Sequence, residues 1–446
     1  MVKKERTCKK CGCTEERACR TKDGPCYWVA DDLCSECLVH EDEVGSWAPA
    51  ADGDKIHIVK LLKENKAKNM QRISIPTTEL LAMLEKVKEV TVAKPMNEIL
   101  TNVYIKVLKK GLQLIATDLN VTLIANIDFV NDGEFGYEYL LPFDFLFKIC
   151  KAVDSEFITV EYNESIIKPK GENITTRSVI ITTLSDTFDI DKLDDPVMWP
   201  ALPAFDIKNS VGIGEDFINC LNHALMTTSN ENTRAALQKV FLKITPDGLT
   251  MASTNTKVVY EKKFDFETTE SANLLVNAKI CKALDGFKNT SISWNNTHLA
   301  FVSSNITLIG TLQDEQFPDY TRYFPASEKN LHISLSELRS LMNKILINKT
   351  PLNSPKATLW LKREIGLIVV DTYNPDLNRS TTIRVACDYS GNCERITIDP
   401  ADMLKLLSQV SYMTLSVTIT EQFKAILIET DADDSYRSII MPLYTA

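Results

Sequence analysis

The feature that most restricts the fold of this chain is a repeat. Six segments carry apolar residues at helical spacing after a polar residue or a proline, and their starts lie 57 to 72 residues apart. A period of this length indicates one structural unit used several times. The segments are 77–90, 142–153, 214–228, 277–287, 334–347 and 399–410.

Short β-rich stretches separate the predicted helices. The pairs Lys110-Gly111 and Asp247-Gly248 within them are typical of tight hairpin turns. One amphipathic helix on a small sheet leaves a sheet edge exposed, so six such units are expected to pair and to join their edges. This predicts an α+β fold of three similar domains, with three unrelated α+β domains as the alternative.

Composition places the domain boundaries. A chain of 446 residues can hold three or four domains. Residues 41–70 mix acidic residues with Ala, Pro and Lys, which is typical of a linker, and proline-containing stretches lie near 200 and 327. We therefore predict a cysteine-rich module at 1–40, a linker at 41–70, and three domains at 71–200, 201–327 and 328–446.

The N-terminal cysteines have the spacing of a metal site. Seven of the twelve cysteines lie between residues 8 and 37, where Cys8 and Cys11 form one CxxC pair and Cys34 and Cys37 another. Each pair can place two thiolates on one side of a tetrahedral Zn²⁺. So short a segment gains its folding energy from the metal. The sequence predicts structural zinc bound by Cys8, Cys11, Cys34 and Cys37.

The other cysteines leave alternatives open. One tetrahedral ion cannot use seven thiolates, so Cys13, Cys19 and Cys26 are spare thiols, part of another ligand set, or ligands of an iron–sulfur cluster. A module without metal is a further alternative. Five scattered cysteines are expected to be small core residues, namely Cys150, Cys220, Cys281, Cys387 and Cys393.

Charge is distributed unevenly along the chain. The net charge is −10, and residues 1–70 hold thirteen basic and thirteen acidic side chains, so the acidic excess lies in the body from residue 71 onward. Such a body repels DNA on average. Basic residues on the predicted helices could still bind phosphates without reading sequence, although a charged outer helix face that suits the helix dipole is the alternative. The candidate DNA-binding residues are Lys86, Lys88, Lys148, Lys151, Lys279, Lys282, Arg339, Lys344 and Lys405.

No catalytic constellation is found in the sequence. The five histidines belong to no HExxH motif, and GxSxG, P-loop and GxGxxG motifs are missing. Asp118 and Asp319 are lone carboxylates at turns, where Asp usually caps backbone amides. The chain also has no run of 18 apolar residues and no N-terminal apolar signal segment. We predict a cytoplasmic protein that is not an enzyme and has no membrane partner.

Four blocks of the body share their order and spacing with a known family. They are NEILTNVYIKVLKKGLQLIATDLNVTLIANI, RAALQKVFLKITPDGLTMASTNTKVVYEKKF, GTLQDEQFPDYTRYFP and the terminal SYRSIIMPLYTA. Across 71–446 the chain thereby resembles the bacterial DNA polymerase III beta sliding clamp family. The resemblance implies three two-helix, two-sheet domains per subunit, and two subunits joined head to tail in a ring whose helices line the hole.

The resemblance implies a processivity factor for DNA replication. Such a ring encircles duplex DNA and tethers DNA polymerase, and short peptide motifs connect it to the polymerase and the clamp loader. Lys94 occupies a position where the family has a basic DNA-contacting residue. The implied location is the cytoplasm of a bacterial or phage-infected cell. The alternative function is a zinc- or iron–sulfur-containing adaptor or redox protein on this scaffold without ring closure.

The resemblance also implies a pocket for partner peptides. An apolar cleft with a flexible Met and a cation can hold the Leu and Phe anchors of many short peptides. The alternative is that its residues only fill the junction of domains two and three. They are Leu237, Thr254, Thr256, Val259, Pro318, Arg322, Tyr323, Ile439, Met441, Pro442 and Leu443.

Two segments of the body depart from the family pattern. TNT at 254–256 stands where the family usually has Thr-Asp-Gly, which alters one wall of the pocket. LNRSTT at 377–382 lacks the glutamates that the family tends to have at its dimer seam, so an ion-paired seam is not expected. A seam on the strand around Val179 and Ile181, pairing edge to edge, is the alternative.

Overall fold

The computed structural model describes residues 70–444 apart from several short gaps. These gaps are 92–94, 132, 168–173, 206–209, 231–233, 266, 327, 351–353, 375, 409, 411–413 and 431–432. Before residue 70 it describes only the backbone of 20–21, 24–25, 28–30 and 33–34. The chain divides into two compact units, one of 1–68 with 166–174 and one of 69–165 with 175–446.

The described part of the first unit contains four short strands. β1 (Arg20–Thr21) pairs with β2 (Gly24–Pro25), and β3 (Trp28–Ala30) pairs with β4 (Leu33–Cys34), both antiparallel. They lie inside the predicted cysteine-rich module. Of the predicted zinc ligands, Cys34 belongs to β4, while Cys8, Cys11 and Cys37 lie outside the described residues.

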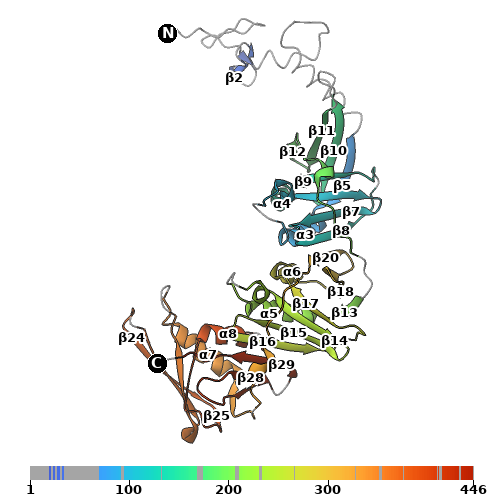
Figure 1. The fold of residues 1–446 in the computed structure, drawn as a ribbon. Helices are drawn as coiled ribbons and strands as arrows, with labels where there is room; N and C mark the ends of the chain where they lie inside the picture. Colours follow the sequence, from blue (N-terminus) through green and yellow to red (C-terminus); the bar gives the residue numbers. More distant parts are fainter. Residues whose placement is uncertain are drawn as a thin grey trace, which may run out of the picture. The chain divides into compact units, whose positions relative to one another are not determined.

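The six predicted helices are present in the second unit. They pack in consecutive pairs, as Figure 1 shows: α3 with α4, α5 with α6, and α7 with α8. Asp399 accepts hydrogen bonds from the first N–H groups of α8, and Asn277 does so for α6. The helices are α3 (Thr77–Lys88), α4 (Phe143–Ala152), α5 (Glu215–Met226), α6 (Ala278–Ala283), α7 (Leu335–Leu346) and α8 (Pro400–Leu407).

Two large sheets run across the predicted domain boundaries. The eight-stranded sheet has the order β13 (Ser210–Ile213), β18 (Thr290–Trp294), β19 (His298–Val302), β20 (Ile306–Thr311), β8 (Val121–Asp128), β7 (Gly111–Thr117), β6 (Asn102–Leu108), β9 (Glu138–Pro142). The nine-stranded sheet has the order β17 (Ala272–Val276), β14 (Val240–Thr245), β15 (Gly248–Thr254), β16 (Val258–Phe264), β29 (Asp433–Ile440), β28 (Ile426–Thr430), β27 (Thr414–Thr418), β21 (Leu331–Ser334), β25 (Asp388–Tyr389). The joints are β8 with β20 and β16 with β29, and both lie within the second unit.

Two four-stranded sheets complete the second unit. One has the order β12 (Thr187–Ile190), β11 (Ile174–Thr182), β10 (Phe157–Ile167), β5 (Met70–Pro76), and the other β24 (Arg379–Ala386), β23 (Leu367–Asn374), β22 (Ala357–Lys362), β26 (Arg395–Ile398). The prediction of an edge strand around Val179 and Ile181 is wrong. Both side chains are fully buried in β11, which lies between β10 and β12, so the edges of this sheet are β12 and β5.

The two predicted glycine hairpins are confirmed. Leu108 pairs with Gly111 at the β6–β7 turn, and Thr245 pairs with Gly248 at the β14–β15 turn. Gly111 has a φ of +128°, and a Cβ there would lie 1.9 Å from the carbonyl oxygen of Ile127. A side chain at this position would therefore disrupt the pairing of β7 with β8.

Helices and sheets bury a continuous apolar core. Cys150, Cys281 and Cys393 lie within it, and burial raises the pKa of the Cys150 and Cys281 thiols to about 12. These cysteines are core residues, as predicted, while Cys220 and Cys387 are half-buried. In the described part of the chain, every helix is too short or too polar to cross a membrane.

Candidate functional site

A pocket lies where β16 pairs with β29. The register there sets Val259 opposite Ile439 and Val258 opposite Ile440. The pocket has a volume of about 290 Å³. Eight of the eleven predicted pocket residues line it, namely Thr254, Thr256, Val259, Pro318, Arg322, Tyr323, Ile439 and Met441.

The other three predicted residues do not line the pocket. Leu237 is buried in the 3₁₀ helix η4 (Ala235–Gln238), and its N–H donates to the carbonyl oxygen of Arg234. Pro442 and Leu443 follow Met441, and the Leu443 N–H donates to the carbonyl oxygen of Thr397 in β26 at 2.7 Å. Both residues are half-buried, and the hydrogen bond of Leu443 attaches the end of the chain to β26.

Four lining residues were missed in the sequence, namely Arg234, Lys257, Asp319 and Tyr320. Three of them lie within or next to the motifs that carried the prediction, because Lys257 follows Thr256 and FPDY contains Asp319 and Tyr320. Arg234 could have been found as the start of the second-domain block. Taking whole blocks in place of single positions would have recovered all four.

The floor of the pocket is a separate apolar cluster. Val259, Tyr320 and Ile439 are buried in it together with two alanines. The rings of Phe241 and Phe317 stack beneath with centroids 4.8 Å apart and planes 7° apart. This cluster is distinct from the main core, so the pocket has a base of its own.

A buried carboxylate holds Tyr320 in place. The Tyr320 hydroxyl donates to Glu261 Oε2 at 2.8 Å, and Arg437 Nε donates to Glu261 Oε1 at 3.0 Å. Glu261 is only 2% exposed, and the Arg437 guanidinium lies 4.3 Å from the centroid of the Phe324 ring. Burial, together with the Glu261 charge, raises the pKa of Tyr320 well above its usual range. The hydroxyl therefore remains a donor at neutral pH.

One wall of the pocket is the turn between β15 and β16. Thr254 Oγ1 donates to the carbonyl oxygen of Val258 at 2.6 Å and accepts from the Thr256 N–H at 3.0 Å. Asn255 Oδ1 accepts from the N–H groups of Lys257 and Val258 at 2.9 and 3.0 Å. Thr256 has a φ of +76°, a region that costs an L-residue roughly 1–2 kcal/mol. The turn is thus tightly bonded and strained at Thr256.

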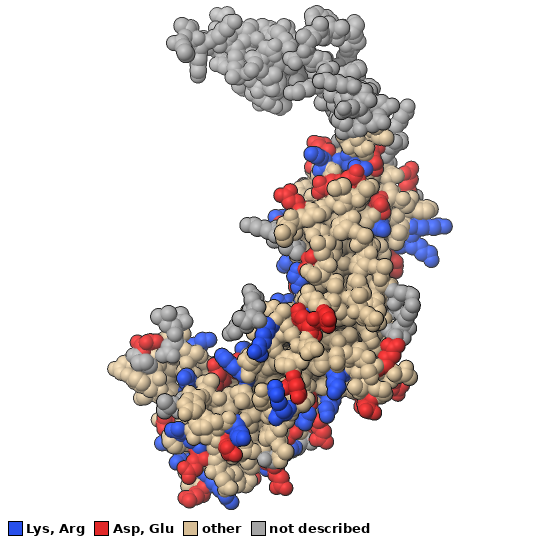
Figure 2. All heavy atoms as spheres, in the orientation of Figure 1, with Lys and Arg blue, Asp and Glu red and all other residues tan. Residues whose placement is uncertain are grey.

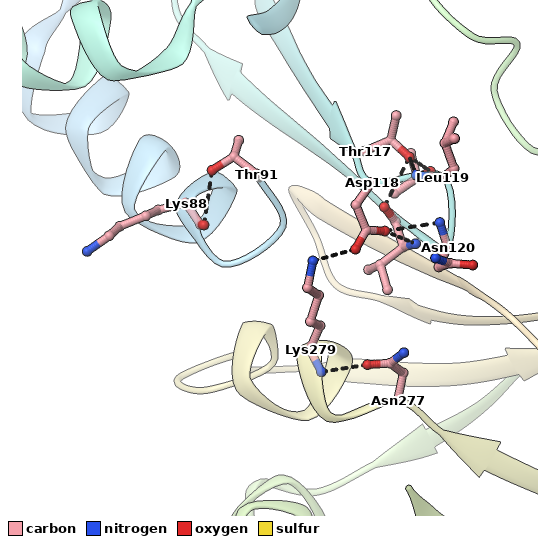
Figure 3. A network of polar contacts seen from close by, with 10 residues as sticks. Lys88, Thr91, Thr117, Asp118, Leu119, Asn120, Asn277 and Lys279 are labelled. Atoms are coloured by element: carbon pink, nitrogen blue, oxygen red, sulfur yellow. Dashed lines mark hydrogen bonds and ion pairs between the residues drawn. The ribbon is translucent and has the colours of Figure 1, made fainter. Parts of the chain in front are cut away.

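The turn between β7 and β8 has the same hydrogen bonds. Thr117 Oγ1 donates to the carbonyl oxygen of Val121 and accepts from the Leu119 N–H, and Asp118 Oδ1 accepts from two following N–H groups. Leu119 has a φ of +74°. Figure 3 shows one difference, since Asp118 also forms an ion pair with Lys279 of α6. This ion pair joins the predicted first and second domains.

Positive charge surrounds the pocket. Its lining contains Arg234, Lys257 and Arg322, all exposed, and one carboxylate, Asp319. Asp319 Oδ1 accepts from the hydroxyl and the N–H of Thr321 at 2.7 and 3.1 Å, and these bonds lower the pKa of Asp319. The lining therefore carries a local cationic excess on an acidic chain.

Five of the predicted DNA-binding residues are exposed on the helices. They lie toward the ends of α3, α4, α6 and α7, and are Lys88, Lys148, Lys151, Lys282 and Lys344. On the face that Figure 2 shows, basic and acidic side chains are intermixed. Lys94 lies outside the described residues. All five side chains are exposed to solvent, but Lys148 forms an ion pair with Asp144 at 3.3 Å and Lys151 with Glu85 at 3.9 Å.

The other four predicted DNA-binding residues have structural partners. Lys86 donates to the carbonyl oxygen of Asp285, and Lys279 pairs with Asp118. Arg339 donates to the carbonyl oxygens of Leu407 and Val410, so it satisfies the C-terminus of α8. Lys405 pairs with Asp402 at 2.8 Å. For these four residues a structural role is visible in the contacts.

Comparison with known proteins gives a consistent result. The family model described as DNA polymerase III beta subunit, N-terminal domain, matches residues 71–194 and 213–321. The Beta sliding clamp of Bacillus subtilis (strain 168) is 21% identical over 362 residues, which cover 75% of this chain and 92% of that protein. The Beta sliding clamp of Staphylococcus aureus is 22% identical over 327 residues, covering 71% and 82%.

Solved structures show the same fold. The DNA polymerase sliding clamp of Bacillus subtilis matches with a TM-score of 0.76 and 19% identity, over 85% of this chain and all of that one. The sliding clamp of Pseudomonas aeruginosa, solved bound to griselimycin, matches with a TM-score of 0.74 and 18% identity, over 84% of this chain and all of that one.

Proposed function

The chain belongs to the DNA polymerase III beta subunit family, and from this premise we propose that two copies form a DNA sliding clamp. The ring encircles duplex DNA without reading its sequence. It keeps a DNA polymerase at its template as a processivity factor and is not itself an enzyme. The polymerase and the clamp loader bind through short peptides, and the ring works in the cytoplasm of a bacterial or phage-infected cell.

The observation that carries this proposal is the pocket at the β16–β29 joint. Residues far apart in the sequence, from Thr254 to Met441, meet there around one apolar space. Its volume of about 290 Å³ suits one or two apolar side chains of a peptide. The cationic lining adds attraction for a peptide that carries acidic residues.

Ring closure is proposed to use two of the strands that end sheets. Inside the chain, β8 pairs with β20 and β16 with β29, so each repeat joins the next through its sheet. In the described residues, the four sheets of the second unit end in β12 and β5, β13 and β9, β17 and β25, and β24 and β26. Of these outer strands, β12 lies in the first predicted domain and β24 in the third. We assign β24 of one copy to pair with β12 of the next. β24 exposes Arg379 and Arg384, and the β12 region exposes Asp186 and Asp189. The proposed seam is therefore charge-complementary, with the carboxylates on the first domain. This differs from the expectation drawn from the missing glutamates at 377–382, which did not favour an ion-paired seam.

A charge swap tests ring closure. Replacing Arg379 and Arg384 by Glu places like charges at the seam and is expected to give a monomer by sedimentation equilibrium. Adding Asp186→Arg and Asp189→Arg to the same chain should restore the dimer. A dimer that survives the first pair of substitutions unchanged contradicts the assigned seam.

Retention on DNA tests the clamp function itself. A ring loaded onto nicked circular DNA should stay bound through gel filtration and leave once the circle is cut. The exposed cations, such as Lys88 and Lys282, supply phosphate contacts in this proposal, so release should be faster at high salt. A chain that leaves circular and linear DNA equally fast is not a topological clamp.

Structural zinc is our proposal for the N-terminal module. Its support is the spacing of the CxxC pairs Cys8–Cys11 and Cys34–Cys37. Mass spectrometry of the metal should give one zinc per chain in a colourless protein. Iron with visible absorbance would instead favour the iron–sulfur adaptor or redox protein. Cys13, Cys19 and Cys26 are candidate cluster ligands in that alternative.

A further inference from the structure

One pocket residue retains a conformation that its residue type disfavours. Thr256 lines the pocket with an exposed side chain and has a φ of +76°. A β-branched residue in this region is rare, because its Cβ crowds the backbone, whereas glycine adopts it freely. The turn would form without strain if residue 256 had no side chain. The Thr256 side chain therefore destabilises the backbone conformation of this turn.

The bonds around Thr256 keep it from relaxing. Its N–H donates to Thr254 Oγ1, and the next two N–H groups donate to Asn255 Oδ1. Thr254 is 4% exposed and forms a further bond to the carbonyl oxygen of Val258. The backbone of Thr256 is consequently held in this conformation at the wall of the pocket.

Strained conformations persist where the surrounding structure imposes them, and Leu119 shows the same strain outside the pocket. What distinguishes Thr256 is that it lines the pocket. We propose that Thr256 is a specificity-determining residue of the pocket. Its branched side chain fills space that a glycine would leave open, and it thereby limits the size of the apolar anchor that a partner peptide inserts. This inference rests on the proposed function, since it concerns the peptide that the pocket binds.

The chain contains a matched control. Leu119 occupies the third position of the equivalent β7–β8 turn, has a φ of +74°, and does not line the pocket. Leu119→Gly removes the same backbone strain at a different joint. Comparing Thr256→Gly with Leu119→Gly thus separates the effect of relaxing a turn from the effect of opening the pocket.

Fluorescence polarisation with two labelled six-residue peptides tests the proposal on the full chain. Both peptides carry a Leu anchor followed by a second anchor, which is Phe in one and Trp in the other. Thr256→Gly should shift the ratio of the two affinities at least fivefold toward the Trp peptide. Leu119→Gly and the shape-preserving Thr256→Val should keep the wild-type ratio. Both glycine variants should raise the thermal midpoint by roughly 1–3 °C.

The possible failures are distinguishable. A Thr256→Gly ratio equal to that of Leu119→Gly would overturn the role of Thr256, as would a Thr256→Val variant that behaves like Thr256→Gly. Failure of the wild-type chain to bind either peptide would instead contradict the proposed pocket. In that case a ring retained on circular DNA would still support the clamp.

Discussion

The two internal joints of the chain are built alike and differ in what fills them. At β8–β20, the turn at 117–122 sends Asp118 into an ion pair with Lys279, and the two domains close on each other. At β16–β29, the turn at 254–259 has the same backbone bonds, but its Asn255 serves only the turn among the described residues. There the space stays open as the pocket. The same turn backbone is thus compatible with a closed domain contact or with an open pocket. The side chains at positions 118 and 255 make part of this difference.

Removing the Glu261 carboxylate, which bonds to Tyr320 of the pocket, should have the largest effect on stability. Glu261→Ala leaves Arg437 and the Tyr320 hydroxyl without their shared acceptor. Since breaking a buried charged pair is costly, the free energy of unfolding should fall by about 3 kcal/mol. Denaturant unfolding measures this. Glu261→Gln, which keeps an acceptor oxygen, should lose less, and equal losses would show that the hydrogen bonds contribute little.

Removing the end of the chain should reduce peptide binding at the β16–β29 joint and leave the β8–β20 joint unchanged. Deletion of 441–446 removes Met441 from the pocket wall together with its hydrogen bond to the carbonyl oxygen of Lys257. Peptide affinity should fall by about a hundredfold or more, which corresponds to about 3 kcal/mol, while the dimer persists. Tyr444→Ala is the control, because it removes only the stack on Phe423. Loss of peptide binding and dimer together would point to misfolding.

Acid should destabilise the β16–β29 joint, because Asp433 of β29 pairs there with Lys262 of β16. Burial would raise the pKa of this carboxyl, but hydrogen bonds from Lys262 and Ser435 hold it at about 2. A pKa below the unfolded value stabilises the fold above pH 4, and this stabilisation is lost as pH falls from about 4 to 2. Wild type should lose about 1 kcal/mol more than Asp433→Asn across this window. Parallel unfolding curves for the two proteins would contradict the assignment.

The smallest change in stability is expected at the β8–β20 joint. Lys279→Ala removes the partner of Asp118, and because the lysine is 41% exposed, stability should fall by only about 0.5–1 kcal/mol. Lys282→Ala, one turn further along α6, should leave stability unchanged and reduce the salt dependence of DNA binding by about one phosphate contact. If Lys279→Ala weakens DNA binding as much as Lys282→Ala does, the ion pair opens on DNA.

Periodicity predicted the elements of this fold well because each helix shows its own apolar stripe. Leu80, Leu84 and Val87 of α3 are all buried, as their spacing requires. The α6 prediction extended four residues too far, since the chain turns at Gly286 with a φ of +71°. The pocket was predicted through its motifs, and the structure brought eight of those residues together.

Other features depend on neighbours that no sequence pattern shows. Arg339 resembles other basic helix residues, yet it caps α8, sixty-eight residues further along the chain. Whether a lysine stays free or meets a carboxylate, as Lys279 meets Asp118, depends on which turn lies opposite. The position of Val179 and Ile181 could not be inferred either, because a strand alternating with polar residues can lie at an edge or inside a sheet.

Sheets that continue through both joints determine how the chain responds to mechanical load. Bending it at β16–β29 would require a row of backbone hydrogen bonds to give way together, because five residue pairs are in register there. Stiffness within each chain leaves the contact between separate chains as the compliant element. A clamp loader that opens the proposed ring would therefore separate the two chains at that contact before it bends either sheet joint.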